Sequence, residues 1–249
     1  MEKSEYEVMF RVEDTHWWYR ALLRLIRRSL DHELPGWRAV SILDAGCGTG
    51  AVLAALGNQR AHLGVDLSAE AIAFCRQRGI HNLAQGDISN LPFGDGSFDV
   101  VICSSVLYHR WVADVGLALR ELRRVLRPGG LLIVNLPAYE LLRSQHDELV
   151  FTARRFTKHE VRRLLIGSGF AIRRLTYWTT LLFPVALAAR TLGGSSTGRD
   201  FTIATQVGLR NRILQQVMRF ELALLRRISL PFGVALFGIA QRPIGGSDL

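Results

Sequence analysis

The chain has 249 residues, of which 49% are hydrophobic and 21% are charged. This composition is typical of a globular protein and excludes a disordered chain, and the length suits one medium domain with additions. The formal net charge is +9 at pH 7, and nearly all of the positive charge is arginine, because Lys3 and Lys158 are the only lysines. Such an excess fits an anionic partner or simply a solvated surface, so charge alone assigns no function.

Cysteine usage and apolar stretches bear on the compartment. Three cysteines cannot all pair, and none has metal-ligand spacing, so we expect a reduced protein without a metal site. No apolar secretory segment follows Met1. The apolar stretches Leu181–Ala189 and Leu230–Ala240 are shorter than the roughly 20 residues that a membrane span needs. We therefore expect a cytoplasmic protein, and contact with a membrane surface stays open.

The first expected element is an amphipathic helix over Glu13–Leu30. Trp18, Leu22 and Leu25 lie on its apolar side, whereas its arginines lie largely on the other side. Pro35-Gly36 ends this helix. The pattern predicts a helical N-terminal segment over residues 1–36.

Short strands then alternate with helices. The expected strands are Val40–Ala45, His62–Val65, Leu83–Gln85, Phe98–Cys103 and Leu131–Leu136, and the expected helices are Ala51–Leu56, Ala69–Arg78 and Asp114–Leu126. This alternation predicts a parallel sheet with helices on both sides. Because ligands of such sheets bind beyond the carboxyl ends of the strands, we expect the chemistry there.

The last third of the chain predicts an edge hairpin interrupted by an insertion. A capping box opens a helix over Thr157–Ser168. Ala171–Tyr177 and Val234–Gln241 are expected strands of an antiparallel hairpin at one edge of the sheet. Between them lies the long insertion 179–230, which contains a Gly/Ser-rich break at Gly193–Gly198 and an arginine-rich amphipathic helix over Leu209–Ile228.

A glycine loop joins the first expected strand to the next helix. Its sequence is Leu43-Asp44-Ala45-Gly46-Cys47-Gly48-Thr49-Gly50, and its alternating glycines differ from the Gly-x-Gly-x-x-Gly spacing of dinucleotide sites. Three glycines in a tight turn let a ligand approach the backbone closely. We interpret Cys47 as a small packing residue rather than a nucleophile.

Acidic residues end the next two expected strands. Asp66, followed by Leu67, lies about 20 residues after Asp44, where nucleotide-binding folds place an acid on the ribose hydroxyls. Asp87 follows Gly86 at the end of the third strand and is placed to accept from an adenine amino group, with Ile88 against the ring. An Asp after a Gly is on its own most often a turn former. Acids at three consecutive strand ends together favour a nucleoside site.

These segments resemble a known family. The stretches Leu43–Gly50, Gly86-Asp87 with Leu91-Pro92-Phe93 and Ser97-Phe98-Asp99, and Arg124–Gly130 are similar to the cofactor-binding core of class I S-adenosylmethionine (SAM)-dependent methyltransferases of the methyltransferase-11 type. The resemblance covers about Ser41–Leu136. Aminopropyl transferases use the same core with decarboxylated SAM, but the acid cluster that would favour polyamine chemistry is not seen.

The resemblance implies an α/β, Rossmann-like fold with a mostly parallel seven-stranded sheet, an antiparallel edge hairpin, an N-terminal lid helix and a helical insertion before the last strand. It divides the chain into a lid (1–36), a SAM-binding core (37–178), the insertion (179–230) and the last strand with a tail (231–249). Asp44 and the three glycines then hold the methionine part, Asp66 the ribose, and Asp87 with Ile88 the adenine. The expected cofactor contacts also include Ala45, Cys47, Leu67, Gly86, Ser104 and Trp18.

Methyl transfer requires a positioned nucleophile, exclusion of water and, for a hydroxyl or ammonium acceptor, a base. His109 follows the fourth expected strand and is the first candidate for this base, although a capping or packing role is an equal alternative. His146, beside two acids, is a second candidate, or part of a polar loop. His16 and Tyr19, with Trp18, begin the N-terminal helix and form either an aromatic lid over the cofactor or an anchor of that helix.

The preferred function is methylation of a small, hydrophobic metabolite or natural product, with oxygen favoured as the acceptor atom and the insertion as a substrate lid. An RNA or protein methyltransferase is an alternative, but the arginines are spread over helices rather than interleaved with aromatics, so nucleic acid is not the expected partner. A basic amphipathic helix over Leu209–Ile228 also fits a membrane-surface lipid methyltransferase. A non-catalytic SAM-binding module is the remaining alternative, and the oligomeric state stays open.

Overall fold

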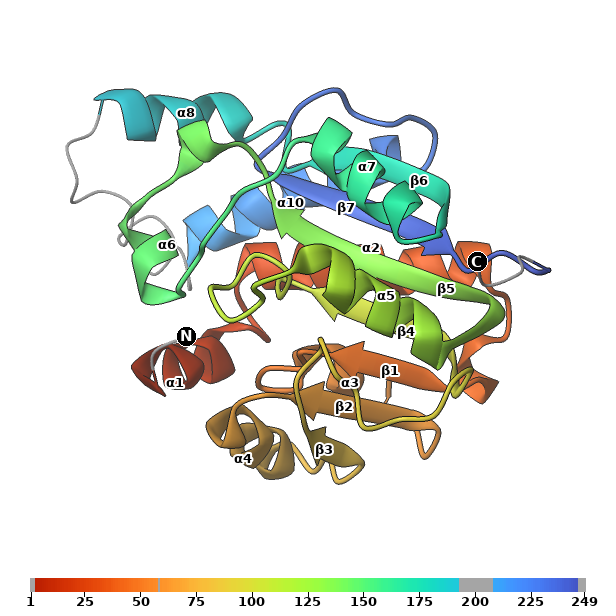
Figure 1. Cartoon of the computed structure of the whole chain (residues 1–249). Helices are drawn as coiled ribbons and strands as arrows, with labels where there is room; N and C mark the ends of the chain where they lie inside the picture. Colours follow the sequence, from red (N-terminus) through yellow and green to blue (C-terminus); the bar gives the residue numbers. More distant parts are fainter. Residues whose placement is uncertain (1–2, 58, 193–207, 246–249) are drawn as a thin grey trace.

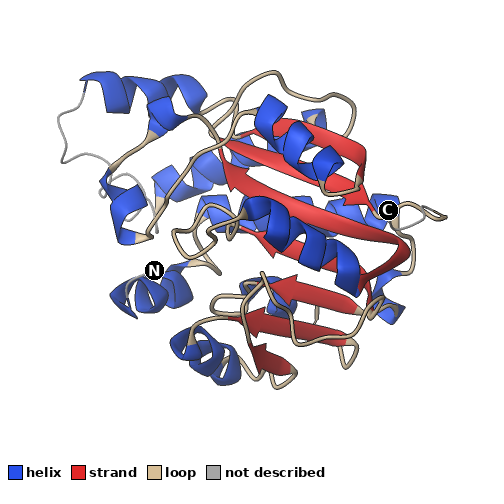
Figure 2. Cartoon of the chain, in the orientation of Figure 1, coloured by secondary structure: helices blue, strands red, loops and turns tan. Residues whose placement is uncertain are grey.

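The computed structural model describes residues 3–57, 59–192 and 208–245 and contains one mixed sheet (Figures 1 and 2). Its strand order is β3-β2-β1-β4-β5-β7-β6. The strands are β1 (Ile42–Ala45), β2 (His62–Asp66), β3 (Leu83–Gln85), β4 (Phe98–Ser104), β5 (Leu126–Pro137), β6 (Ala171–Trp178) and β7 (Ala235–Gln241). Strands β1 to β5 pair in parallel, whereas β7 is antiparallel to both β5 and β6. The predicted seven-stranded α/β fold with an antiparallel edge is confirmed.

Helices cover both faces of the sheet. Helices α5 (Val115–Val125) and α7 (Lys158–Gly167) lie on one face, and α2 (Trp17–Glu33) and α10 (Leu209–Leu224) lie behind the sheet in Figure 1. The strand side chains alternate between the two cores: Val101 and Cys103 pack toward α5, whereas Val100 and Ile102 pack toward α2. Strands β1 and β4 and the second half of β5 are therefore largely buried on both sides, which explains their mainly apolar sequences.

The parallel strands end at one edge, where the chain order reverses. β1 lies between β2 and β4, and the chain moves outward from β1 to β3 before it returns to β4. Such a reversal leaves a crevice beyond the carboxyl ends of the two central strands. Helices α1 (Lys3–Val12), α6 (Gln145–Leu149) and α8 (Phe183–Leu192) gather at this edge, on the left of Figure 1.

The N-terminal prediction was wrong in one respect, because two helices stand where one was expected. Helix α1 ends at Val12 and α2 begins at Trp17, so the expected start at Glu13 falls in the connection. Glu13 is buried and bound to Thr49 and Arg78, and His16 has an extended backbone and caps α2. The contacts of Glu13 with distant parts of the chain, together with the local cap at His16, interrupt the helix.

Helices α3 (Ala51–Ala55) and α4 (Ala69–Gln77) agree with the expected helices within a few residues. The short 3-10 helices η1 (Trp37–Ala39) and η2 (Glu140–Leu142) were not among the expected elements. β5 starts earlier than expected, because Gly129 and Gly130 exchange hydrogen bonds with Arg242 beyond the end of β7. α10 stops at Leu224 rather than Ile228, where the Arg174 side chain donates to the carbonyls of Leu225 and Ile228. The predicted Gly193–Gly198 break lies outside the described residues.

Candidate active site

A cavity of about 250 Å³ lies at the carboxyl ends of the parallel strands. The predicted site residues that line it are Trp18, Tyr19, Asp44, Gly46, Cys47, Gly48, Asp66, Leu67, Gly86, Asp87, Ile88, Ser104, His109 and His146. Ala45, Gly50 and His16 are absent from its wall. Residues from β1, β2, β4 and the loop after β3 therefore line one cavity, as expected for a ligand that binds beyond the carboxyl ends of parallel strands.

The glycine loop forms the floor of the cavity. The backbone N–H groups of Gly46 and Cys47 both donate to the carbonyl of Val65, at 2.7 and 3.0 Å. Gly46 has a positive φ of 83°, and a Cβ there would lie 2.2 Å from Val106. Only glycine permits this turn. Gly50 does not line the cavity, and its Cβ would instead meet Ile80 at 2.7 Å, so its role is in packing α3.

Asp44 is a buried carboxylic acid at the end of β1. It is 1% exposed, and its Oδ2 atom has no hydrogen-bond partner among the described residues. Burial, and then the nearby charges of Asp66 and Glu13, raise the pKa of Asp44 to about 8. An unpartnered buried oxygen on a cavity wall is a binding position for a ligand that brings a donor or a positive charge.

Asp66 ties the second strand end to the glycine loop. Its Oδ2 accepts from the Gly48 N–H and its Oδ1 from the Ser68 N–H, both at 2.9 Å. Burial nevertheless raises its pKa above the ordinary value. Because a carboxylate has about four acceptor positions, two remain for hydroxyl groups of a ligand.

The loop after β3 supplies the third part of the wall. Asp87 is exposed and its Oδ1 accepts from the Ser89 N–H at 2.8 Å, which is the turn-forming contact considered above. Ile88 is 5% exposed and presents an apolar surface to the cavity. Gly86 lies close to Pro92, since a Cβ at Gly86 would be 3.1 Å from that ring. A flat apolar group with polar edges fits this combination.

The first helix, α1, covers the cavity and was not among the expected elements, because the only helix predicted within residues 1–36 was Glu13–Leu30. Helix α1 and the following turn contribute six lining residues, namely Glu5, Tyr6, Val8, Met9, Val12 and Glu13. Burial and then the Asp66 charge raise the pKa of Tyr6 to about 12. The spacing of Tyr6, Met9 and Val12 at every third residue is a helical signal that could have identified α1.

Arg78, at the end of α4, fixes this cover to the core. Its guanidinium donates to Glu13 at 2.6 Å, to Asp14 at 2.9 Å and to the Phe10 carbonyl at 3.2 Å. Its Nε donates to the Thr49 carbonyl at 2.8 Å, and the Thr49 hydroxyl donates to Glu13. The turn after α1 is thus bound directly to the glycine loop.

Trp18 extends from α2 to the cavity wall and packs against a side chain of the sheet. Its ring stacks on Trp178 with centroids 5.5 Å apart. The Trp178 Nε1 donates to the Asn135 side chain at 2.9 Å, and the Asn135 amide donates to the Ser105 hydroxyl at 3.0 Å. Ser105 has a positive φ of 61°, a strained conformation that often marks functional loops.

Three of the four predicted catalytic side chains face the cavity. His109 is half-buried and stacks on Trp111, and burial lowers its pKa to about 4, so the ring is neutral at pH 7. The Nδ1 atom of His109 has no hydrogen-bond partner among the described residues. Burial also lowers the pKa of His146, on α6. Burial and the nearby Glu13 raise the pKa of Tyr19.

His16 does not reach the cavity, so its predicted catalytic role is not supported. The side chain is 1% exposed, and its Nδ1 accepts from the Trp18 N–H at 3.3 Å. This bond makes His16 the N-cap of α2. Ala45 likewise lies inside β1 and is 0% exposed.

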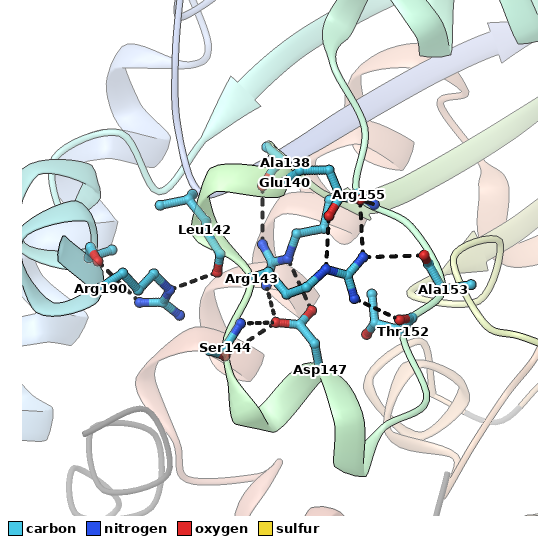
Figure 3. Close-up of polar contacts among 11 residues, drawn as sticks. Ala138, Glu140, Leu142, Arg143, Ser144, Asp147, Thr152, Ala153, Arg155 and Arg190 are labelled. Atoms are coloured by element: carbon cyan, nitrogen blue, oxygen red, sulfur yellow. Dashed lines mark hydrogen bonds and ion pairs between the residues drawn. The ribbon is translucent and has the colours of Figure 1, made fainter. Parts of the chain in front are cut away.

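A polar network holds helix α6 in place (Figure 3), and His146 belongs to this helix. Arg155 and Asp147 form a buried ion pair with an N–O distance of 3.0 Å, and Arg155 also donates to the Ala138 carbonyl. Asp147 accepts from the Ser144 N–H at 2.7 Å, which completes a capping box. The predicted polar loop at His146 is therefore a short, anchored helix. Arg190 from α8 donates to the Leu142 carbonyl at 2.7 Å.

Metal and membrane features are absent from the described residues. No group of three or more His, Cys, Asp or Glu side chains there is placed to hold a metal ion. No helix within the same residues is long and apolar enough to cross a bilayer.

Comparisons with known proteins identify the domain. Residues 43–134 match a family model described as a methyltransferase domain. A malonyl-[acyl-carrier protein] O-methyltransferase of Erwinia pyrifoliae is 36% identical over 180 residues, which cover 67% of this chain and 65% of that protein. A fatty-acid O-methyltransferase of Mycolicibacterium smegmatis is 41% identical over 112 residues, which cover 40% of this chain and 39% of that protein.

The sequence matches cover only part of the curated relatives, whereas a structural match covers nearly all of this chain. The matched segments span 35% to 65% of the curated relatives' own lengths. A methyltransferase from Haloferax volcanii, solved in complex with its Trm112 activator, has a similar fold with a TM-score of 0.62 and 20% identity, covering 96% of this chain and 94% of that one. The cofactor of this family is SAM, and the chain belongs to the class I SAM-dependent methyltransferases.

Proposed function

We propose that the protein transfers a methyl group from SAM to an oxygen atom of a small, hydrophobic acceptor. The observation that carries the proposal is that one cavity is lined both by acids and glycines at the strand ends and by apolar and aromatic side chains from α2, α6 and the loop after β4. The acids include Asp44 and Asp66, and the apolar and aromatic side chains include Tyr19, Trp111 and Leu149. A cationic cofactor fits the acids and glycines, and an apolar acceptor from which water is excluded fits the apolar and aromatic side chains.

The residues at the strand ends fit SAM. We propose that Asp44, Gly46 and Gly48 hold its methionine part, Asp66 its ribose, and Asp87 with Ile88 its adenine. The unpartnered Oδ2 of Asp44 supports the first assignment, and the apolar side chain of Ile88 supports the last. When bound, SAM supplies a methyl group that is already activated by the sulfonium. The protein residues then need only orient the acceptor and exclude water.

The relatives favour a carboxyl oxygen as the acceptor atom. Two of them are named as O-methyltransferases of a malonyl-[acyl-carrier protein] and of a fatty acid. A carboxylate is deprotonated at pH 7, so its methylation needs no strong base. This suits a site whose central histidine, His109, has its pKa lowered to about 4 by burial.

Methyl transfer to a panel of acyl compounds tests this proposal. Purified protein and methyl-labelled SAM are incubated with fatty acids, with a malonyl thioester and with matched fatty alcohols, and the products are treated with mild alkali. We expect label in the acids that alkali releases as methanol, because methyl esters are hydrolysed. Alkali-stable label in the alcohols alone would contradict the carboxyl assignment.

His109 is proposed to orient the acceptor oxygen as a neutral imidazole. The His109→Ala variant is expected to lower turnover by up to about 100-fold through loss of alignment, with a smaller change in SAM affinity. Because His109 is neutral above a pKa of about 4, the wild-type turnover number at saturating SAM should not fall as pH drops through 6.5. A His109→Gln variant serves as the partial-rescue control. An unaltered rate in His109→Ala would remove this residue from the mechanism.

Asp44 is expected to release a proton when SAM binds at pH 7. Burial, with Asp66 and Glu13 nearby, raises its pKa to about 8, so the free protein holds this carboxyl protonated. A cationic ligand beside it favours the ionised form. Calorimetry in two buffers of different ionisation enthalpy should therefore give different apparent enthalpies, and Asp44→Asn should abolish the difference. Equal enthalpies for the wild type would refute this placement.

A further inference from the structure

Helix α10 has two apolar sides, and the described residues cover only one of them. Met218 and Leu222 are buried against α2. On the opposite side, Leu209, Ile213 and Phe220 are 73%, 53% and 60% exposed. Their spacing of four and seven residues aligns these three side chains along the helix. Exposed large apolar side chains in a row mark an interaction surface.

The flanks of this apolar row are positively charged. The exposed arginines of α10 and the turn after it are Arg210, Arg212, Arg219, Arg226 and Arg227. None of them forms an ion pair with an acid in the described part of the chain. The one acid of the helix, Glu221, is 0% exposed and accepts from the backbone N–H groups of Thr179 and Leu181.

The neighbouring helix α2 extends the same charge. α2 and α10 pack side by side behind the sheet in Figure 1. Burial lowers the pKa of Arg24, and so do the nearby positive charges of Arg20, Arg219 and Arg28. At the C-terminal end of α2, Asp31 forms an ion pair with Arg38, and Glu33 forms one with Arg173. The two helices therefore present like charges that repel one another until an anionic partner neutralises them.

We propose that the face formed by α2 and α10 binds an anionic membrane surface. Apolar side chains in a row with arginines beside them are the pattern of a helix that lies in the bilayer interface. Single-stranded RNA, by contrast, is bound by aromatic rings that stack on its bases, and α10 exposes one aromatic side chain, Phe220.

The location of α10 connects this face to the cavity. The side chains of Asn211 and Gln215 donate to the Thr15 carbonyl at 3.0 and 3.2 Å, and the Trp17 N–H donates to Asn211 at 2.9 Å. Thr15 lies in the turn that joins the cover α1 to α2. The helix that carries the exposed row is therefore bound, through its covered side, to the turn beside the cavity cover.

Vesicle sedimentation of the full chain tests the proposal without SAM or acceptor, so its outcome is independent of the proposed reaction. The probes are vesicles of phosphatidylcholine with phosphatidylglycerol as a minor component, and vesicles of phosphatidylcholine alone. We expect sedimentation with the anionic vesicles only, weakening as salt is added. An Arg24→Gln/Arg219→Gln double variant should bind about 30-fold more weakly, since each basic residue near an anionic leaflet contributes about fivefold.

Two further variants separate charge from apolar contact. Ile213→Ser/Phe220→Ser should also lose sedimentation, whereas the control Arg162→Gln/Ile166→Ser on α7, on the opposite face of the sheet, should not. Ile166 is 56% exposed and so matches Phe220. Absence of sedimentation by the folded wild type would overturn the proposal. So would an equal loss in the α7 control, or binding of RNA or an acidic protein by this face in place of vesicles.

Discussion

The Arg155→Ala variant is expected to have a free energy of unfolding about 3–5 kcal/mol below that of the wild type. The side chains of Arg155 and Asp147 are 9% and 4% exposed, so the substitution leaves a buried carboxylate without its cation. The loss is measured by urea unfolding followed by circular dichroism. Arg120→Ala is the matched control, because its pair with Asp114 is exposed and should contribute about 0–1 kcal/mol. Equal effects of the two substitutions would contradict this reading of Figure 3.

The size of the Arg155 effect is expected to depend on pH. Burial by itself would raise the pKa of Asp147, but the charge and hydrogen bonds of Arg155, with those from Ser144, hold that pKa below its ordinary value. A lowered carboxyl pKa stabilises the folded state above the ordinary pKa, and this contribution is lost as pH falls through the lowered value. The difference between wild type and variant should therefore be largest near pH 7 and shrink in acid.

The Asp66→Ala variant is expected to bind SAM more weakly by about 1–3 kcal/mol, the cost of losing a charged hydrogen-bond acceptor. Part of this loss is expected from the proposed contacts of Asp66 with the ribose. The rest is expected because Asp66 accepts from the Gly48 N–H and so holds the glycine loop in place. Isothermal titration calorimetry measures the change in affinity.

Asp114→Ala is the control for Asp66. Asp114 also accepts from backbone N–H groups at the start of a helix, but it lies at the start of α5 and does not line the cavity. Its replacement should cost stability without changing SAM affinity. Unchanged SAM affinity in a folded Asp66→Ala protein would show that the ribose is placed wrongly.

The sheet and the strand-end residues were predictable because their signals are local. Most of the strands are short apolar runs, and Asp44, Asp66 and Asp87 lie at or just after the ends of three of them. Parallel pairing then brings these positions to one edge, whatever the details of packing. The glycine loop was equally clear, since the positive φ of Gly46 and Gly48 restricts those positions to glycine.

The attachment of the cover to the core and the anchoring network were not predictable from local patterns. α1 is joined to the core by Arg78, and α6 by Arg155, and in each case the partner is fixed only by tertiary folding. The same holds for His16: its place at the start of a helix fits a lid residue or a cap equally, and the bond to the Trp18 N–H makes it a cap. The family and the fold likewise leave the acceptor open, because related folds host different substrates.

The most direct test of the account is transfer of labelled methyl groups in an extract of the source organism. Purified protein and methyl-labelled SAM are added to the extract, which is then separated into organic, RNA and protein fractions. We predict protein-dependent label in the organic fraction, lost in Asp66→Ala. Label confined to RNA or protein would contradict a small hydrophobic acceptor, and protein-dependent label in no fraction would contradict methyl transfer to such a compound.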